Sequence, residues 1–172
     1  MSEPSSLVLT GASGFIGRHL LGALASDPGL APAFRRVTLL IRSPASLTRL
    51  VPLPDAWQAV EWDLSGSAAL PAGTLGPETV VVHLAAPTGR ATAGQMHKAI
   101  VGGTRRLTEA CRVAGVRHLI HVSSIAAGFT DRRWYPYAEA KRSAEAIALA
   151  SGVPVTIVRP TMVFGPGSPV QH

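Results

Sequence analysis

The sequence predicts an α/β domain built on a doubly wound, parallel β-sheet. Three observations support this fold class. Short apolar runs alternate with segments of helical spacing along the chain, an order that produces β-α-β units with right-handed crossovers. The run TVVVHLAA is almost continuously apolar, as is typical of a strand buried on both faces. A glycine-rich turn directly follows the first apolar run, where such a sheet passes from strand to helix.

Six strands and three helices are expected along the chain. The predicted strands are residues 6–10, 36–41, 57–62, 79–86, 118–124 and 153–160. The predicted helices are residues 14–25, 92–114 and 137–151. Gly115 and Gly152 follow the last two helices, and glycine is a common helix-stop residue because it adopts the left-handed conformation readily. Residues 65–78 form a loop rich in Gly, Pro and Ser.

Length and composition favour one domain with a packed core. The chain has 172 residues, of which 47% are hydrophobic, and this size suits a single domain. The N-terminus lacks the basic and apolar regions of a signal peptide, and no apolar run approaches the ~18 residues of a membrane span. Cys111 is the single cysteine, so an internal disulfide is excluded and a core role is expected. We therefore expect a cytoplasmic protein that does not bind membranes.

The basic charge balance does not predict nucleic-acid binding. The formal net charge is +6 and the sequence pI about 10.7. The arginines are mostly scattered and aromatic residues make up only 5% of the chain, whereas nucleic-acid binding requires a basic stripe with interleaved aromatics. Small anionic ligands account for the balance equally well, so we expect a small-molecule substrate and no nucleic-acid partner.

The segment TGASGFIG, which follows the first strand, predicts a dinucleotide-binding turn of the Rossmann type. Gly11 permits the tight turn, Gly14 lets the backbone approach a pyrophosphate, and Gly17 allows close packing of helix on strand. The N–H groups at the start of the helix then face the anion. Ser13, Phe15 and Ile16 lie on the same turn and complete this part of the predicted site.

The end of the second strand favours NADP(H) over NAD(H). An NAD site usually carries Asp or Glu there to bind the ribose 2′-hydroxyl. No acidic residue lies between Phe34 and Ala45, and Arg42 stands in this region. A guanidinium forms charge-assisted bonds to a 2′-phosphate, and Ser43 can add a hydroxyl. NADP is therefore the expected cofactor, with NAD as the alternative.

The segment YAEAK places Tyr137 and Lys141 four residues apart, on one face of a predicted helix. The pair is either a proton donor with an activating cation or part of a solvated helix face. A nearby lysine charge favours tyrosinate, and together with a bound oxidised nicotinamide it predicts a lowered pKa for Tyr137. Trp134 and Tyr135, just before, are interpreted as loop packing or substrate contacts. His83, at the end of a buried strand, is interpreted as structural, and no metal-binding spacing is found.

With these segments in order, the chain resembles the extended short-chain dehydrogenases/reductases, the NAD(P)-dependent epimerase/dehydratase family. TGASGFIG, WDL, VVHLAA, HVSSIAA, YAEAK and VRPTMVFGPG match the motifs of this family in its order. The resemblance implies that Ser124, Tyr137 and Lys141 are catalytic, with Ser123 as the alternative serine. Lys141 would also hold the nicotinamide ribose. Further cofactor contacts are implied for Asp63, Leu64, Leu84, Ala85, Ala86 and Pro160.

Two departures from the family pattern stand out. Ile100 occupies the position where the family has Asn, so a polar tether or relay is lost there. The sequence stops at FGPGSPVQH, whereas extended members continue into a smaller domain that shapes the substrate pocket. The resemblance therefore implies that residues 1–172 are a dinucleotide-binding Rossmann domain, either truncated before the substrate domain or a natural short form.

The expected function is an NADP(H)-dependent oxidoreductase that transfers a hydride to or from a carbonyl or secondary alcohol through a Ser-Tyr-Lys site. The alternative is a nucleotide-sugar epimerase or dehydratase with bound NAD, and a non-catalytic nucleotide sensor is a third reading. Activity of the 172-residue chain alone is in doubt, and a homodimer stays open as its assembly.

Overall fold

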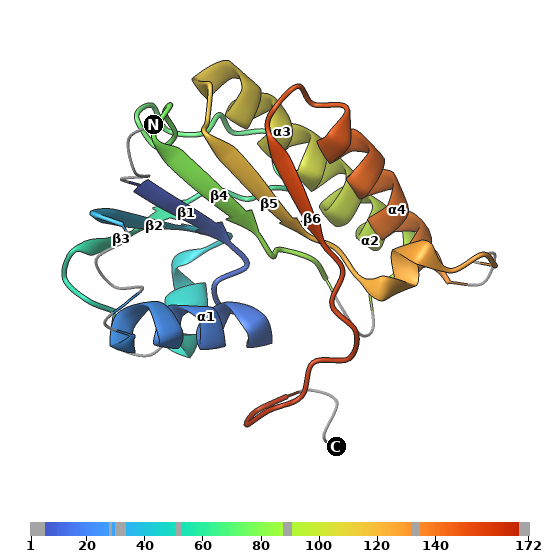
Figure 1. Ribbon diagram of the computed structural model, residues 1–172, viewed down its shortest axis with the longest axis horizontal. Coiled ribbons are helices and arrows are strands. Elements are labelled where there is room, and N and C mark those ends of the chain that lie inside the picture. Colours follow the sequence, from blue (N-terminus) through green and yellow to red (C-terminus); the bar gives the residue numbers. More distant parts are fainter. Residues whose placement is uncertain are drawn as a thin grey trace.

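A computed structural model describes residues 6–27, 29, 34–50, 53–87, 91–131 and 135–168. They form a six-stranded parallel sheet in the order β3-β2-β1-β4-β5-β6 (Figure 1). The strands are β1 (Ser6–Thr10), β2 (Arg36–Ile41), β3 (Trp57–Glu61), β4 (Thr79–His83), β5 (His118–Val122) and β6 (Val155–Val158). The order reverses between β1 and β4, so the carboxyl ends of these two strands form the crevice where ligands bind in such sheets.

Helices lie on both faces of the sheet, which confirms the predicted doubly wound fold. Figure 1 shows α1 on one face and α2, α3 and α4 on the other. The helical elements are α1 (Phe15–Ser26), η2 (Pro44–Arg49), α2 (Ala93–Met96), η3 (His97–Gly102), α3 (Gly103–Ala114), η4 (Ile125–Gly128) and α4 (Pro136–Leu149). The helix predicted at 92–114 comprises α2, the π-helical η3 and α3 in direct succession. It begins with a capping box, in which Thr92 and Gln95 bond each other's backbone N–H.

Four strands end earlier than the sequence predicts, the third by one residue, at Glu61. The fourth strand ends at His83 and not at Ala86, and the fifth ends at Val122. The sixth is confined to Val155–Val158. The hydrogen bond from Leu84 N to Thr10 O, at 3.3 Å, continues the backbone pairing of β4 with β1 by one residue, and Ala85 N then donates to the Thr10 side chain at 3.2 Å. Residues beyond it stay apolar because they line a cavity, so hydropathy alone does not mark the end of the strand.

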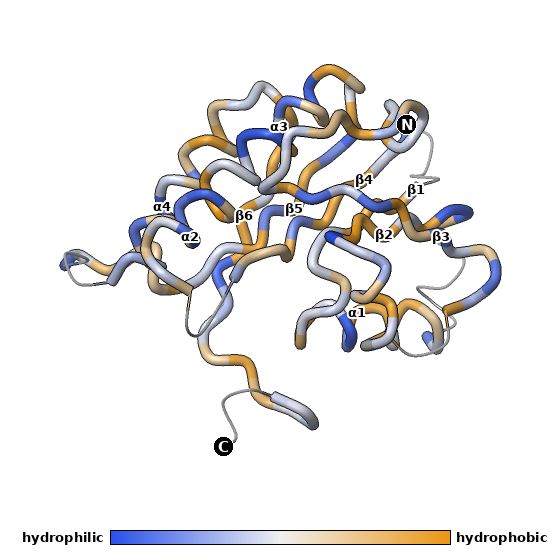
Figure 2. The backbone as a smooth tube through the Cα atoms, turned by 180° about the vertical axis from the view of Figure 1, so that it is seen from behind, coloured by the Kyte–Doolittle hydropathy of each residue, from blue (hydrophilic) through white to orange (hydrophobic). Residues whose placement is uncertain are grey.

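Two apolar layers hold the sheet between its helices. On one face Leu107 and Cys111 of α3 pack against Val8 and Leu119. On the other, Leu21 of α1 lies in a cluster with strand residues of β1 and β2, and Figure 2 shows hydrophobic stretches running through the strands and α1. Burial raises the pKa of the Cys111 thiol to about 12, so the structure confirms its core role.

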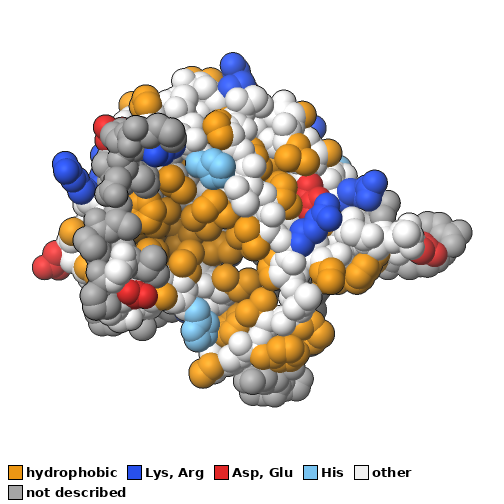
Figure 3. Space-filling view, viewed as in Figure 1, with side chains coloured by type: hydrophobic (Ala, Val, Ile, Leu, Met, Phe, Trp, Pro, Cys, Tyr) orange, Lys and Arg blue, Asp and Glu red, His pale blue; other side chains and the backbone are white. Residues whose placement is uncertain are grey.

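The face that carries α1 is covered unevenly. Figure 1 shows α1 beneath β1 and β2, away from β5 and β6. Alternate residues of β5 are half-buried, and Val158 of β6 is exposed. Figure 3 shows hydrophobic side chains gathered in a hollow on this face. A broad apolar surface of this kind is a common site of association.

Candidate functional site

The turn from β1 into α1 is built around glycines that leave no room for a side chain. Gly11 has φ +72°, and a Cβ there would lie 2.7 Å from the backbone nitrogen of Ala85. A Cβ on Gly17 would lie 2.4 Å from the carbonyl oxygen of Gly11. Gly14, the N-cap residue of α1, donates its N–H to Gly11 O at 3.0 Å. The missing side chains let this turn lie directly against the end of β4.

A cavity of about 260 Å³ opens at this turn, beside the carboxyl ends of β1, β2 and β4. It brings together most of the predicted cofactor residues: Gly11, Ser13, Gly14, Arg42, Asp63, Leu64, Leu84, Ala85 and Ala86. Sequence reasoning missed the rest of the lining: Ala12, Leu40, Ile41, Ser46, Trp62, Ser65, Pro87 and Ala99. Trp62 is the first residue of the WDL segment, so its position next to the predicted cofactor residue Asp63 could have indicated that it lines the cavity. The turn at Gly11 and Gly14, together with the polar side chains of Ser13, Arg42 and Asp63, fits a dinucleotide.

Five predicted cofactor residues lie outside this cavity. Gly17 and Ile16 lie within the first turn of α1. Phe15 packs edge-on against His19, with ring centroids 4.7 Å apart, and Pro160 accepts the N–H of Ile125 at 3.0 Å. Lys141 belongs to a second cluster, described below.

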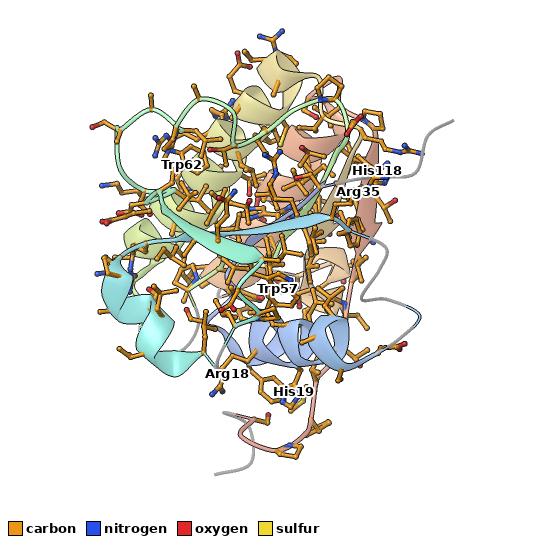
Figure 4. The ribbon with its side chains drawn as sticks, turned by 90° about the vertical axis from the view of Figure 1, so that its left-hand side faces the viewer. Arg18, His19, Arg35, Trp57, Trp62 and His118 are labelled. Carbon is orange, nitrogen blue, oxygen red and sulfur yellow. The ribbon has the colours of Figure 1, made fainter. Side chains whose placement is uncertain are left out.

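The β2 and β3 ends of the cavity carry opposite charges. Arg42 directly follows β2 and its side chain is exposed at the rim. Asp63, just beyond β3, accepts the N–H of Ser65 at 2.9 Å. Figure 4 shows Trp57 and Trp62 at opposite ends of β3, with Trp57 toward α1 and Trp62 toward α3. The cavity therefore combines an arginine at its β2 end with a tryptophan and an aspartate at its β3 end.

Ser124, Tyr137 and Lys141 come together at the end of β5. The side chain of Ser124 lies close enough to Tyr137, in the first turn of α4, to lower the pKa of its phenol. Lys141 lies one turn later, only 3% exposed, and donates from Nζ to Val122 O at 2.9 Å. Its Nζ is 5.8 Å from the centroid of the Tyr137 ring. Ser123 is buried beside Glu145 instead, so Ser124 is the serine that faces Tyr137. Trp134 lies outside the described residues.

Burial dominates the electrostatics of this cluster. It raises the pKa of Tyr137, with a smaller contribution from Tyr135, while the hydrogen bond from Ser124 acts in the opposite direction. In the protein by itself, burial therefore determines the direction of the shift, whereas the lowering was expected with an oxidised nicotinamide bound. Burial also lowers the pKa of Lys141 to about 8, against the opposing effect of Glu145. At neutral pH the cluster therefore consists of a neutral phenol and an ammonium.

Two histidines lie beneath the cluster, between the sheet and the helices α3 and α4. Thr10 Oγ1 lies 2.7 Å from His83 Nδ1, and Thr104 Oγ1 lies 3.1 Å from His83 Nε2. His83 is therefore a satisfied structural residue, as predicted. His121 lies 5.2 Å from it, ring to ring, and neither of its ring nitrogens has a hydrogen-bond partner among the described residues. Burial, followed by the charge of Lys141, lowers the pKa of His121 to about 4.

Ile100, the departure from the family pattern, is fully packed. It forms an apolar cluster with Ala140 and Ala144 of α4, against which Tyr137 also lies. Within the described ranges, no cluster of His, Cys, Asp and Glu side chains is placed to hold a metal ion. No helix in those ranges is long and apolar enough to cross a bilayer.

Comparison with known proteins agrees with this geometry. Residues 11–167 match a family described as NAD(P)H-binding. The ceramide reductase of Caulobacter vibrioides is 34% identical, over 94% of this chain and 47% of that protein. The 4-hydroxy-2-methyl-3-oxo-4-farnesyl-3,4-dihydroquinoline-1-oxide ketoreductase of Stigmatella aurantiaca is 30% identical, over 91% of this chain and 50% of that protein. The solved structure of MoeE5 in complex with UDP-glucuronic acid and NAD has a TM-score of 0.74 at 28% identity, over 98% of this chain and 58% of that one.

The fold and the glycine cavity define an NAD(P)H-binding domain of the Rossmann type. The chain belongs to the extended short-chain dehydrogenases/reductases, the epimerase/dehydratase family. It spans about half the length of the curated relatives named above.

Proposed function

We propose that the protein is an NADPH-dependent reductase of carbonyl groups. The observation that carries this proposal is the meeting of Ser124, Tyr137 and Lys141 at the carboxyl end of β5. The phenol of Tyr137 is neutral at neutral pH, so it carries the proton that reduction of a carbonyl group needs. The names of two relatives, a ceramide reductase and a ketoreductase, support the same direction.

In the proposed mechanism, each side chain of the cluster has a separate task. A bound reduced nicotinamide would supply the hydride to the carbonyl carbon. Tyr137 donates its phenolic proton to the carbonyl oxygen, and Ser124 orients that oxygen through its hydroxyl. Lys141 stabilises the tyrosinate that proton transfer leaves behind, because an ammonium favours a neighbouring anion. The glycine turn would hold the pyrophosphate, and Lys141 the nicotinamide ribose.

Arg42 supports NADPH over NADH as the reductant. Its guanidinium lies at the β2 rim of the cavity, where an NAD site would carry an acid. Arg42→Ala should weaken NADPH binding about tenfold and leave NADH binding nearly unchanged, since a hydrogen bond to a charged group contributes ~1.5–3 kcal/mol. Fluorescence titration of both nucleotides measures this. Equal affinities in the wild-type protein would refute the preference.

The alternative, a nucleotide-sugar epimerase or dehydratase with bound NAD, has one observation in its favour. MoeE5, whose structure contains UDP-glucuronic acid and NAD, aligns over almost the whole chain. Mass spectrometry of the nucleotide that co-purifies separates the two functions. Tightly held NAD would support the epimerase, whereas the reductase exchanges NADPH freely.

Oxidation of NADPH against a panel of ketones and aldehydes tests the reaction itself. Tyr137→Phe keeps the ring and removes the transferable proton, so kcat should fall at least about a hundredfold while NADPH affinity stays nearly unchanged. Lys141→Ala should weaken both nucleotide binding and turnover. A Tyr137→Phe protein that retains wild-type kcat would exclude Tyr137 as the proton donor.

A further inference from the structure

A row of three aromatic rings leads from Tyr137 to the surface. The ring centroids of Tyr137 and Tyr135 are 5.9 Å apart, and those of Tyr135 and Phe129 are 6.4 Å apart. The ring planes of Tyr137 and Tyr135 are inclined to each other by 37°, and those of Tyr135 and Phe129 by 32°. Tyr135 is 43% exposed and Phe129 is 44% exposed. The row therefore offers ring surface to solvent in direct continuity with the proposed proton donor.

Local structure fixes the backbone that carries the two outer rings, those of Phe129 and Tyr135. Phe129 closes the η4 turn by donating its N–H to Ala126 O at 3.1 Å. Tyr135 is the N-cap residue of α4, immediately before Pro136, and proline at the first helical position restricts the backbone there. The rings are thus held by the same two elements that position Ser124 and Tyr137.

Apolar surface continues on the other side of Ser124. Ile125, the next residue, is 47% exposed, and its backbone is tied to Pro160 O. Figure 3 shows hydrophobic side chains along this edge of the molecule. Among the described residues, Ser124 and Tyr137 therefore lie between two groups of exposed apolar side chains, with Ile125 on one side and Tyr135 and Phe129 on the other.

An ion pair between described residues lies near this edge. Arg159 lies beside Gly128, and its guanidinium binds the Glu145 carboxylate through two hydrogen bonds, at 2.9 and 2.6 Å. This pair lowers the pKa of Glu145 and raises that of Arg159. Bidentate pairing occupies two of the guanidinium donors and neutralises its charge. The exposed rings and this pairing therefore favour an uncharged substituent over a sugar diphosphate.

We infer that the row formed by Tyr135 and Phe129 binds an apolar substituent of the substrate, an alkyl chain or ring that extends beyond the reacting carbonyl. The inference rests on the proposed function, because Tyr137 fixes where the carbonyl lies. Burial of apolar and aromatic surface supplies the affinity. Phe129, at the outer end, sets the preference for longer substituents.

Isothermal titration of the 172-residue chain with NADP⁺ and straight-chain methyl ketones, from pentanone to decanone, tests the inference. Affinity should rise up to about two- to fourfold for each methylene that reaches the row. Phe129→Ala should flatten this series, with a loss of about tenfold or more at decanone. Leu149→Ala is the matched control, because Leu149 is also exposed but lies at the far end of α4; it should keep the series intact.

Three results would overturn the inference: affinity independent of chain length, the same effect from Phe129→Ala and Leu149→Ala, or tighter binding of UDP-glucose than of decanone. Failure of the proposed function has a different signature. In that case NADPH reduces none of the ketones, while the length series and its loss in Phe129→Ala persist.

Discussion

Gly17 shows how little room the turn after β1 leaves for a side chain. A Cβ at this position would lie 2.4 Å from Gly11 O and 2.7 Å from Ala12 O, and both oxygens belong to backbone that cannot move without opening the turn. Gly22, in the same helix, has nothing within 4 Å of its Cβ position. One helix thus contains a glycine that the site requires and one that it does not.

Gly17→Ala and Gly22→Ala should therefore have opposite effects. Gly17→Ala should lower the free energy of unfolding by about 1–3 kcal/mol through overpacking and weaken dinucleotide binding. Gly22→Ala should raise it by about 0.5–1 kcal/mol, because alanine is the better helix former. Urea denaturation and NADPH titration measure both. Similar effects from the two variants would show that the contact at Gly17 does not limit the turn.

His121 predicts how stability depends on pH. Its pKa is about 4 in the folded protein against an ordinary value of 6.5, so the unfolded chain binds more protons between these values. Stability must then fall as pH drops from 6.5 toward 4. His83, Lys141 and Glu145 face the same region, and the lowered pKa of His83 acts in the same direction.

His121→Leu should weaken this acid sensitivity. Between pH 7 and pH 5 the wild-type protein should lose about 2 kcal/mol more of its free energy of unfolding than the variant does. At neutral pH the variant should be close to wild type or more stable, because it removes two buried nitrogens without partners. Urea denaturation at several pH values measures the difference. Parallel pH profiles for the two proteins would contradict this account.

At the scale of elements, helix α3 fixes the segment that forms the β3 end of the cavity. Arg106 Nη1 donates to Asp63 O at 2.7 Å, and its Nη2 donates to Ala68 O. The guanidinium also stacks over the Trp62 ring, 4.8 Å from its centroid. Gly103, one turn earlier, packs against Leu64. The backbone of Asp63 and the ring of Trp62 therefore depend on a helix that lies outside the glycine turn.

Arg106→Ala should weaken the binding of NADPH and of adenosine diphosphate ribose by about tenfold. The reason is that hydrogen bonds from a charged donor stabilise the bound conformation of this segment by ~1.5–3 kcal/mol. Arg106→Lys should not restore affinity, since lysine cannot bind both carbonyls and stack on the indole. Arg112→Ala is the control: Arg112 is exposed on the same helix and pairs with Glu109. Loss of affinity in the control, or none in Arg106→Ala, would exclude this role.

Sequence patterns predicted the elements better than their interfaces. The glycines that follow the helical segments predicted where two helices end, and Gly115 and Gly152 do adopt positive φ angles, 63° and 77°. The glycine motif and strand order located the cavity, because the carboxyl ends of neighbouring parallel strands must meet. The contacts of Arg106 with the segment of Trp62 and Asp63 could not be predicted from sequence patterns, because 43 residues separate Asp63 from Arg106 and no motif links them. The raised pKa of Tyr137 was equally hidden, because it depends on burial and not on spacing.

At the scale of the whole molecule, apolar surface is concentrated beside one edge of the sheet. The edge strand β6 exposes Val158, and the segment after it exposes Met162, Val163 and Phe164. Its backbone returns toward α1, where Pro166 O lies 3.1 Å from His19 Nε2. Exposed apolar edge strands favour pairing between chains.

We therefore expect the 172-residue chain to self-associate in a concentration-dependent manner. Val158→Thr combined with Met162→Thr should shift the association to higher concentration, because both side chains lose apolar surface while threonine keeps the β-propensity of residue 158. Val113→Thr is the matched control: Val113 is also exposed, but it lies on α3, across the sheet. Sizing chromatography with light scattering over a range of concentrations measures the effect. A chain that stays monomeric at high concentration would refute the expectation, and an equal shift from the control would assign association to general hydrophobicity and not to the β6 edge.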